Sequence, residues 1–176
     1  MQAKCRAGSA SSESRNDGAI DSEQRVAAPE PVVEATEEGA AELGAVYWLE
    51  VERFMRGLVV ANVNADGSVQ LRLRPGGRVL LAFGVPELTV EDEGVRCTYP
   101  IVNGFLVRRA GGTISFSQEA GPPLALASRI TGFFPRFAAP PGRPEWTGAL
   151  YEGVQRRLHL ALSKRYFCAL LAGERG

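Results

Sequence analysis

The stretch "SVQLRLRPGGRVLLAFGV", residues 68–85, carries apolar side chains at alternate positions on both sides of a Pro-Gly-Gly turn. The alternating apolar positions are Val69, Leu71, Leu73, Val79, Leu81 and Phe83. A period of two residues places such side chains on one face of a strand, and glutamine and arginine fall on the other face of the first strand. The stretch therefore predicts two antiparallel strands with one face buried.

The same kind of pattern continues in both directions along the chain. Downstream, strands are expected in "VRCTYP" (95–100), "TISFSQE" (113–119) and "LALASRITGFFPRF" (124–137). Upstream, "VYWLEVERF" (46–54) and "GLVVANV" (57–63) are rich in the aromatic and β-branched residues that favour strands. Turn signals such as Asp-Gly separate these segments. We therefore expect a mainly β domain, an antiparallel β-barrel or a strongly curved meander sheet of about eight or nine strands.

One long helix is expected at the end of this domain, over residues 147–171, with Thr147 as its N-cap. At about 100° per residue, its apolar residues form a stripe that would pack on the sheet. Arg165 falls near the middle of that stripe, and His159, the only histidine, falls just beyond its margin. Arg165 could extend to solvent over the core, or it could hold a carboxylate or phosphate at the mouth of a cavity.

This order of elements, strands followed by one helix, resembles the lipocalin-type barrels. The resemblance covers element order only, because the short Gly-x-Trp signature of that group is absent before the first expected strand. The α+β helix-grip folds, a curved sheet around a long C-terminal helix, are the alternative. They usually insert two helices after the first strand, and "RGLVVANVNADG" (56–67) does not have a helical pattern.

Residues 1–44 differ in composition from the remainder of the chain. They contain nine acidic and four basic residues, and they lack aromatic side chains. A segment of this kind buries too little apolar surface to offset its chain entropy, which predicts a disordered acidic tail. The single domain is expected over residues 45–172.

Several classes of function are disfavoured by composition. The net charge is zero and the arginines are scattered, so nucleic acid is not an expected partner. Three separated cysteines and one histidine do not supply a metal site, and no cofactor is expected. No stretch resembles a signal peptide or a membrane span, and the cysteine usage suits a reducing compartment, so a cytoplasmic protein is expected.

The candidate site residues are polar groups that the strand and helix patterns direct inward. Tyr99, Gln118, Trp48, Arg108 and Arg165 are the candidates for ligand binding, and His159 and Tyr99 are the candidates for acid–base catalysis. If Trp48 faces inward, Glu50 does so too and could pair with an arginine. The pattern favours the opposite orientation, with Tyr47 inward.

Three functions remain open on this basis. The first is binding of a small, largely apolar ligand, which could carry an anionic group, in the barrel cavity. The second is a cofactor-independent cyclase or isomerase acting on an apolar substrate in the same cavity. The third is a structural or interaction protein with a filled core, which forms a homodimer through Leu160, Phe167 and Leu171 on the far side of the helix.

Overall fold

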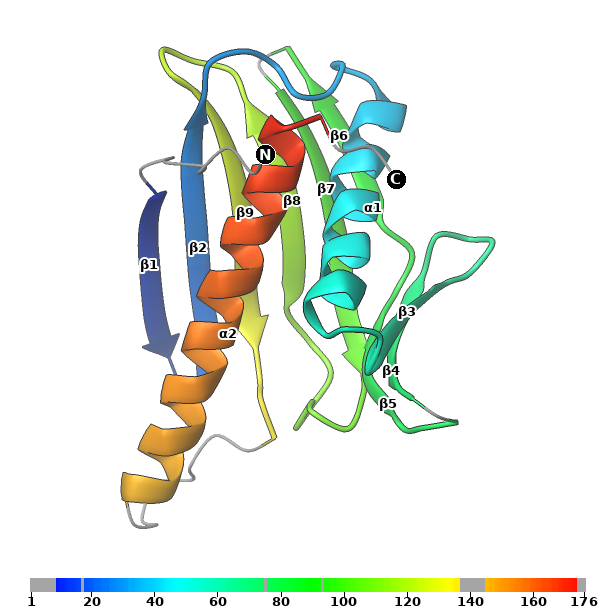
Figure 1. Ribbon diagram of the computed structural model, residues 1–176, viewed down its shortest axis with the longest axis vertical. Coiled ribbons are helices and arrows are strands. Elements are labelled where there is room, and N and C mark those ends of the chain that lie inside the picture. Colours follow the sequence, from blue (N-terminus) through cyan, green and yellow to red (C-terminus); the bar gives the residue numbers. More distant parts are fainter. Residues whose placement is uncertain (1–8, 17, 75, 93, 137–144, 174–176) are drawn as a thin grey trace.

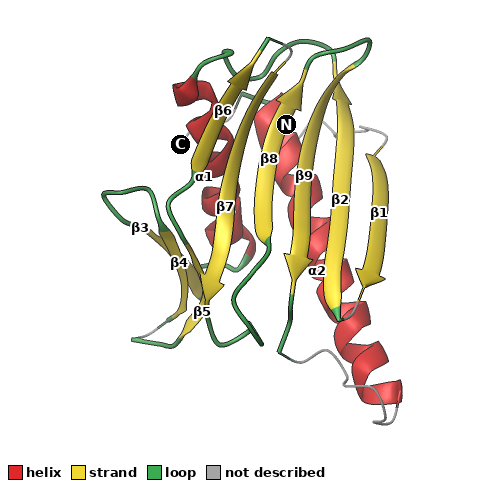
Figure 2. Ribbon diagram, turned by 180° about the vertical axis from the view of Figure 1, so that it is seen from behind, coloured by secondary structure: helices red, strands yellow, loops and turns green. Residues whose placement is uncertain are grey.

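The computed structural model describes residues 9–16, 18–74, 76–92, 94–136 and 145–173; for residues 9–11, 14–16 and 145–156 it describes the backbone alone. Within these residues, nine antiparallel strands form one sheet, and two helices lie on the same face of that sheet (Figure 1). Seen from behind, the other face of the sheet carries no helix formed by the described residues (Figure 2). The core therefore lies between the inner face of the sheet and the two helices.

The strands follow one another mostly as a meander. Their bounds are β1 Ser9–Asn16, β2 Ala19–Ala28, β3 Val59–Val63, β4 Val69–Leu73, β5 Val79–Phe83, β6 Glu87–Glu91, β7 Gly94–Asn103, β8 Thr113–Glu119 and β9 Leu124–Phe133. In space the order is β1-β2-β9-β8-β7-β5-β4-β3, and β6 also pairs with β7. The strands expected around 68–85 are thus β4 and β5, paired in antiparallel register from Val69 with Phe83 onward.

The sheet is open, because β1 and β3 form its two edges and do not pair with each other. The expectation of a mainly β fold with an antiparallel meander sheet and a C-terminal helix is confirmed, in its open-sheet form. The barrel form and the likeness to lipocalin-type barrels find no support in this topology. The helix-grip alternative usually has two helices after the first strand, whereas here one helix, α1, lies between β2 and β3.

Helix α1 spans Glu37–Phe54, so the strand expected over residues 46–54 was wrong. Thr36 is the N-cap, and its side chain accepts a hydrogen bond from the backbone N–H of Gly39 at 3.1 Å. Two glutamates follow in the first turn, where the helix dipole favours negative charge. Buried residues then recur at helical spacing through Ala40, Leu43, Tyr47 and Val51. This period of three to four residues outweighs the strand propensity of the aromatic and β-branched residues.

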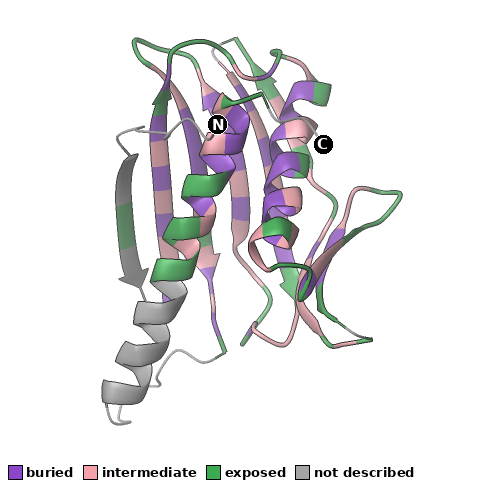
Figure 3. Cartoon of the chain, in the orientation of Figure 1, coloured by how far each residue is buried: buried purple, intermediate pink, exposed green. Residues whose placement is uncertain are grey.

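The expectation of a disordered tail over residues 1–44 also differs from the structure. Residues 9–44 contain β1, β2 and the first part of α1, and residues 1–8 lie outside the described residues. Strand β2 pairs with β9 from Ile20 opposite Phe133 to Ala28 opposite Leu124, so it belongs to the body of the sheet. Buried and partly exposed residues alternate along it (Figure 3). Two of its buried residues, Ser22 and Gln24, are polar, which hid this alternation in the sequence.

Helix α2 spans Glu145–Leu171, in agreement with the helix expected over residues 147–171. Near its C-terminal end, Tyr166, Phe167 and Leu170 are buried in the main hydrophobic core. Phe167 is only 3% exposed and Leu171 packs against the same core, which leaves Leu160 as the most exposed of the three residues expected to form a dimer contact. Phe167 is therefore part of the chain's own core, and its substitution would test folding rather than dimerisation.

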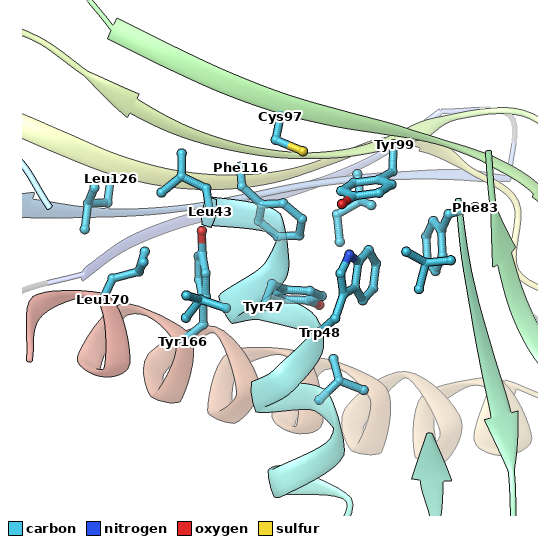
Figure 4. Close-up of a cluster of buried hydrophobic side chains, with 14 of the residues drawn as sticks. Leu43, Tyr47, Trp48, Phe83, Cys97, Tyr99, Phe116, Leu126, Tyr166 and Leu170 are labelled. Atoms are coloured by element: carbon cyan, nitrogen blue, oxygen red, sulfur yellow. The ribbon is translucent and has the colours of Figure 1, made fainter. Parts of the chain in front are cut away.

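An aromatic cluster joins α1, α2 and the sheet (Figure 4). The Tyr47 ring lies 4.4 Å from that of Phe116 on β8 and 5.4 Å from that of Tyr166 on α2, measured between centroids. Helix α1 approaches β7 closely at Gly44, where an added Cβ atom would stand 2.7 Å from the Tyr99 hydroxyl oxygen. Glycine at this position thus sets the depth at which α1 packs on the sheet.

Candidate functional site

A cavity of about 290 Å³ lies between the sheet and the helices, beside the aromatic cluster. Side chains from α1, α2 and most of the strands line it. They are Glu13, Ile20, Ser22, Tyr47, Trp48, Val51, Phe54, Met55, Val59, Leu71, Leu80, Leu81, Phe83, Ile101, Leu106, Ile114, Ile130, Phe133, Leu158, His159 and Leu162. Apolar and aromatic side chains dominate this lining, as they do in binding sites for small apolar molecules.

The two helices and the sheet each have a distinct part in forming this space. The C-terminal part of α2 is held in the core by Tyr166 and Leu170, and an earlier turn supplies Leu158 and Leu162 to the cavity. Figure 4 shows Tyr166 between α2 and the sheet on one side of Tyr47 and Trp48, and Phe83 on the other side of Trp48. The packed half of the core and the cavity are thus neighbours, with Tyr47 and Trp48 between them.

Trp48 is one of the predicted site residues that reach the cavity. Its ring lies 4.8 Å from Phe83, which also lines the cavity, and 5.2 Å from Tyr99, which does not. Because residues 46–54 are helical, Tyr47 and Trp48 both lie on the buried side of α1, and the choice between them that a strand imposes does not arise. Tyr47 faces the core, as the sequence pattern favoured, and Trp48, whose inward orientation was the alternative, faces the core as well.

His159 is the other predicted residue in the cavity lining. Its Nε2 atom is buried and has no hydrogen-bond partner among the described residues. Burial lowers the pKa of the imidazole below its ordinary value of 6.5, since desolvation disfavours the charged form. The ring is therefore predominantly neutral at neutral pH, and a neutral imidazole nitrogen can donate or accept one hydrogen bond, depending on the tautomer.

Tyr99 is buried in the core behind Trp48 and does not line the cavity. Burial, together with the neighbouring Cys97, raises the pKa of its phenol to about 12. Burial likewise raises the pKa of the Cys97 thiol to about 11. Both groups are thus uncharged members of the packing between α1 and β7. Of the two candidates for acid–base catalysis, His159 and Tyr99, only His159 lines the cavity.

Gln118 on β8 is engaged by the loop that connects β2 to α1. Its Oε1 atom accepts hydrogen bonds from the backbone N–H groups of Val32 at 2.7 Å and Val33 at 3.1 Å. Its Nε2 atom donates to the carbonyl oxygen of Val33 at 2.9 Å. The side chain is buried, and these three bonds occupy it as a clamp on the loop that leads into α1. Gln118 does not line the cavity.

Arg165 pairs with a buried carboxylate on α1. Its Nε atom lies 3.3 Å from Oε2 of Glu50, and Nη1 of Arg53 lies 2.9 Å from Oε1 of the same residue. The Glu50 side chain is 4% exposed, whereas that of Arg165 is 51% exposed. The guanidinium group therefore lies at the surface, where it links α2 to α1, and it does not line the cavity. From the sequence, an inward Glu50 paired with an arginine was the alternative that goes with an inward Trp48, and the structure contains such a pair.

Arg108 lies in the connection between β7 and β8 and is exposed. Its backbone N–H donates to the carbonyl oxygen of Phe134 at 2.8 Å, which ties this connection to the end of β9. Sequence reasoning did not anticipate Ser22 and Glu13, because both lie in the segment that was expected to be disordered. The alternation of buried and partly exposed residues along β2 is the signal that could have identified Ser22.

Comparison of the chain with protein-family models, with curated proteins and with solved structures found no match. Within the part of the chain that the structure describes, no three His, Cys, Asp or Glu residues are grouped so that they could hold a metal ion. Among the same residues, neither helix is long and apolar enough to cross a bilayer. The cavity and its lining are therefore the observations on which a function can be argued.

Proposed function

We propose that the protein binds a small, largely apolar molecule in the cavity between the sheet and the two helices. The observation that carries this proposal is a cavity of about 290 Å³ with an almost wholly apolar lining. Ligand sites have volumes from roughly 300 Å³ upward, and they combine an apolar lining with a few polar groups that fix orientation. The volume here suits a small ligand at the lower limit of that range.

The aromatic side chains beside the cavity also support binding. The cavity adjoins an aromatic cluster in which Trp48 packs on Phe83 and Tyr47 packs on Phe116. Aromatic side chains of this kind supply large contact areas with few rotatable bonds, so little conformational entropy is lost when a ligand packs on them. Leu158, which lines the cavity from α2, is 46% exposed, so the lining continues to the surface at this helix.

The proposal includes a reducing compartment such as the cytoplasm. Cys97 and Cys168, the cysteines within the described residues, form no disulfide. Proteins from such compartments rarely form disulfides.

The uncharged fluorophore N-phenyl-1-naphthylamine provides a direct test, because its emission rises on transfer from water to an apolar site. We expect saturable binding of one equivalent by the wild-type protein. Leu81→Trp adds bulk inside the cavity lining and should weaken this binding several-fold. Exciting the probe at wavelengths that tryptophan does not absorb keeps the added indole out of the signal.

Leu58→Trp is the matched control, because Leu58 is 62% exposed and does not line the cavity. It should leave the affinity for the probe unchanged. Failure of the wild-type protein to bind the probe, or equal binding by the Leu81 and Leu58 variants, would contradict the proposal. Native mass spectrometry of protein purified from its own host is an independent test, because it would detect a retained ligand directly.

A further inference from the structure

Three of the polar side chains that line the cavity come from the end of it at β1, β2 and α2, whereas Tyr47 and Trp48 line it from α1. Glu13 on β1 and Ser22 on β2 are directly opposite each other in the β1–β2 ladder, and both line the cavity. His159 lines it from α2, which passes over β2 (Figure 1). The opposite edge of the sheet, β3 to β5, contributes only apolar side chains, among them Leu71 and Leu81. The lining therefore changes from polar to apolar across the sheet.

Two of these polar groups have hydrogen-bonding capacity to offer. The Oγ atom of Ser22 accepts a hydrogen bond from Nε2 of Gln24 at 3.3 Å, which leaves its own O–H able to donate. Nε2 of His159 is buried without a partner within the described residues, and a buried polar atom in this state is destabilising until a ligand or water pairs with it. A ligand hydroxyl, which both donates and accepts, can satisfy either tautomer of the imidazole.

The charges near this end of the cavity disfavour an anionic ligand. Within the described residues, no lysine or arginine lines the cavity, and the half-exposed Arg165 pairs with Glu50. Glu13, at the polar end, is itself acidic. A carboxylate or phosphate placed there would lose its hydration without gaining a cationic partner, which is costly. The anionic group considered from the sequence therefore has no partner in this lining.

We infer that the ligand is an uncharged, hydroxyl-bearing apolar molecule, bound with its hydroxyl group at Ser22 and His159 and its apolar body toward β3 to β5. This inference rests on the proposed function and adds to it the chemical class and the orientation of the ligand. Ser22 and His159 are the residues that determine specificity for the hydroxyl group.

Three probes of one shape test the inference by displacement of N-phenyl-1-naphthylamine at neutral pH: naphthalene, 2-naphthol and 2-naphthoate. We expect 2-naphthol to bind about tenfold more tightly than naphthalene, the effect of pairing one buried polar group. The anion 2-naphthoate should bind most weakly. In His159→Phe the affinity for naphthalene should persist, while the preference for 2-naphthol over naphthalene should disappear. Ser22→Ala, a smaller change, should reduce the same preference.

The single histidine of the chain supplies a second readout that does not depend on a variant. In protein labelled with ¹⁵N-histidine, one imidazole gives the signal, and its Nε2 resonance should shift on binding of 2-naphthol much more than on binding of naphthalene. For the orientation, Leu81→Trp, at the apolar end, should weaken naphthalene and 2-naphthol to the same extent.

The outcomes separate the two proposals. Equal affinities for naphthalene and 2-naphthol in the wild-type protein, or tightest binding of 2-naphthoate, would overturn the inference while the proposed function stands. The inference would also be overturned if the Nε2 resonance of His159 did not shift on binding of 2-naphthol. Absence of binding by N-phenyl-1-naphthylamine and all three probes would overturn the proposed function, and the inference would fall with it.

Discussion

The hydrogen bonds of Gln118 allow a quantitative prediction for the stability of the fold. Gln118→Leu keeps a similar side-chain volume but removes both acceptor bonds, at 2.7 and 3.1 Å, and the donor bond at 2.9 Å. The N–H and C=O of Val33 are buried, whereas Val32 is partly exposed, so water can replace only the bond to Val32. Two orphaned buried groups at about 1–3 kcal/mol each predict a loss of about 2–6 kcal/mol in the free energy of unfolding.

Urea unfolding followed by far-ultraviolet circular dichroism measures this loss. Gln70→Leu on β4 is the matched control, because Gln70 is partly exposed and its side chain bonds only to the exposed Arg72 in the described contacts. The control should change the free energy of unfolding by no more than about 0.5 kcal/mol. If the Gln118 variant lost no more stability than the Gln70 variant, Gln118 would not be the clamp on the β2–α1 loop, and the reasoning would be refuted.

Two further predictions concern charged groups beside the helices. Arg165→Met removes one of the two described partners of the buried Glu50 carboxylate. Because the guanidinium group is half-exposed, the free energy of unfolding measured by urea titration should fall by only about 1–2 kcal/mol. Adding Glu50→Gln should restore part of this loss, and a larger loss in the double variant would contradict the pairing. For His159, whose folded-state pKa is lowered by burial, the unfolded chain binds the proton first as the pH falls below the ordinary pKa of 6.5. As the pH falls below 6.5, the free energy of unfolding should therefore decrease more steeply for the wild-type protein than for His159→Asn. Parallel plots of this free energy against pH for the two proteins would contradict the prediction. Glu13 and Tyr47, the other titratable groups in the cavity lining, are common to both proteins.

The sequence pattern was sufficient for strands whose buried face is apolar. In β4, β7 and β8 the alternation is visible without any structure, and the long apolar stripe of α2 predicted that helix within two residues at its start. In β2 the inward positions include Ser22 and Gln24, so the period of two was concealed by composition. In α1 the helical period competes with residues of high strand propensity, and tertiary packing decides between them.

The candidate site was predictable only in part, because some of its residues have partners that lie far away in the sequence. His159 was proposed from the helical pattern and lines the cavity. Trp48 also lines it, although the strand expected there was wrong and its pattern favoured an inward Tyr47. The partners that occupy Gln118 and Arg165 lie on other elements, and no local pattern reveals them: Val32 and Val33 for the former, Glu50 for the latter. An inward polar side chain predicts burial, whereas its availability to a ligand depends on such distant partners.

The pairing of β2 with β9 has a consequence for how the chain folds. Ile20 and Phe133 face each other across this pair and both line the cavity, so one wall of the site joins segments more than 100 residues apart. Pairings between such distant segments form slowly, because the intervening loop must first be closed. During synthesis β2 emerges long before β9, and until then β1 is its one strand partner among the described residues. Its serine, glutamate, glutamine and arginine side chains keep the waiting strand hydrated and oppose premature association with other chains. The polar composition that conceals β2 in the sequence thus also suits a strand whose second partner, β9, is synthesised more than 100 residues later.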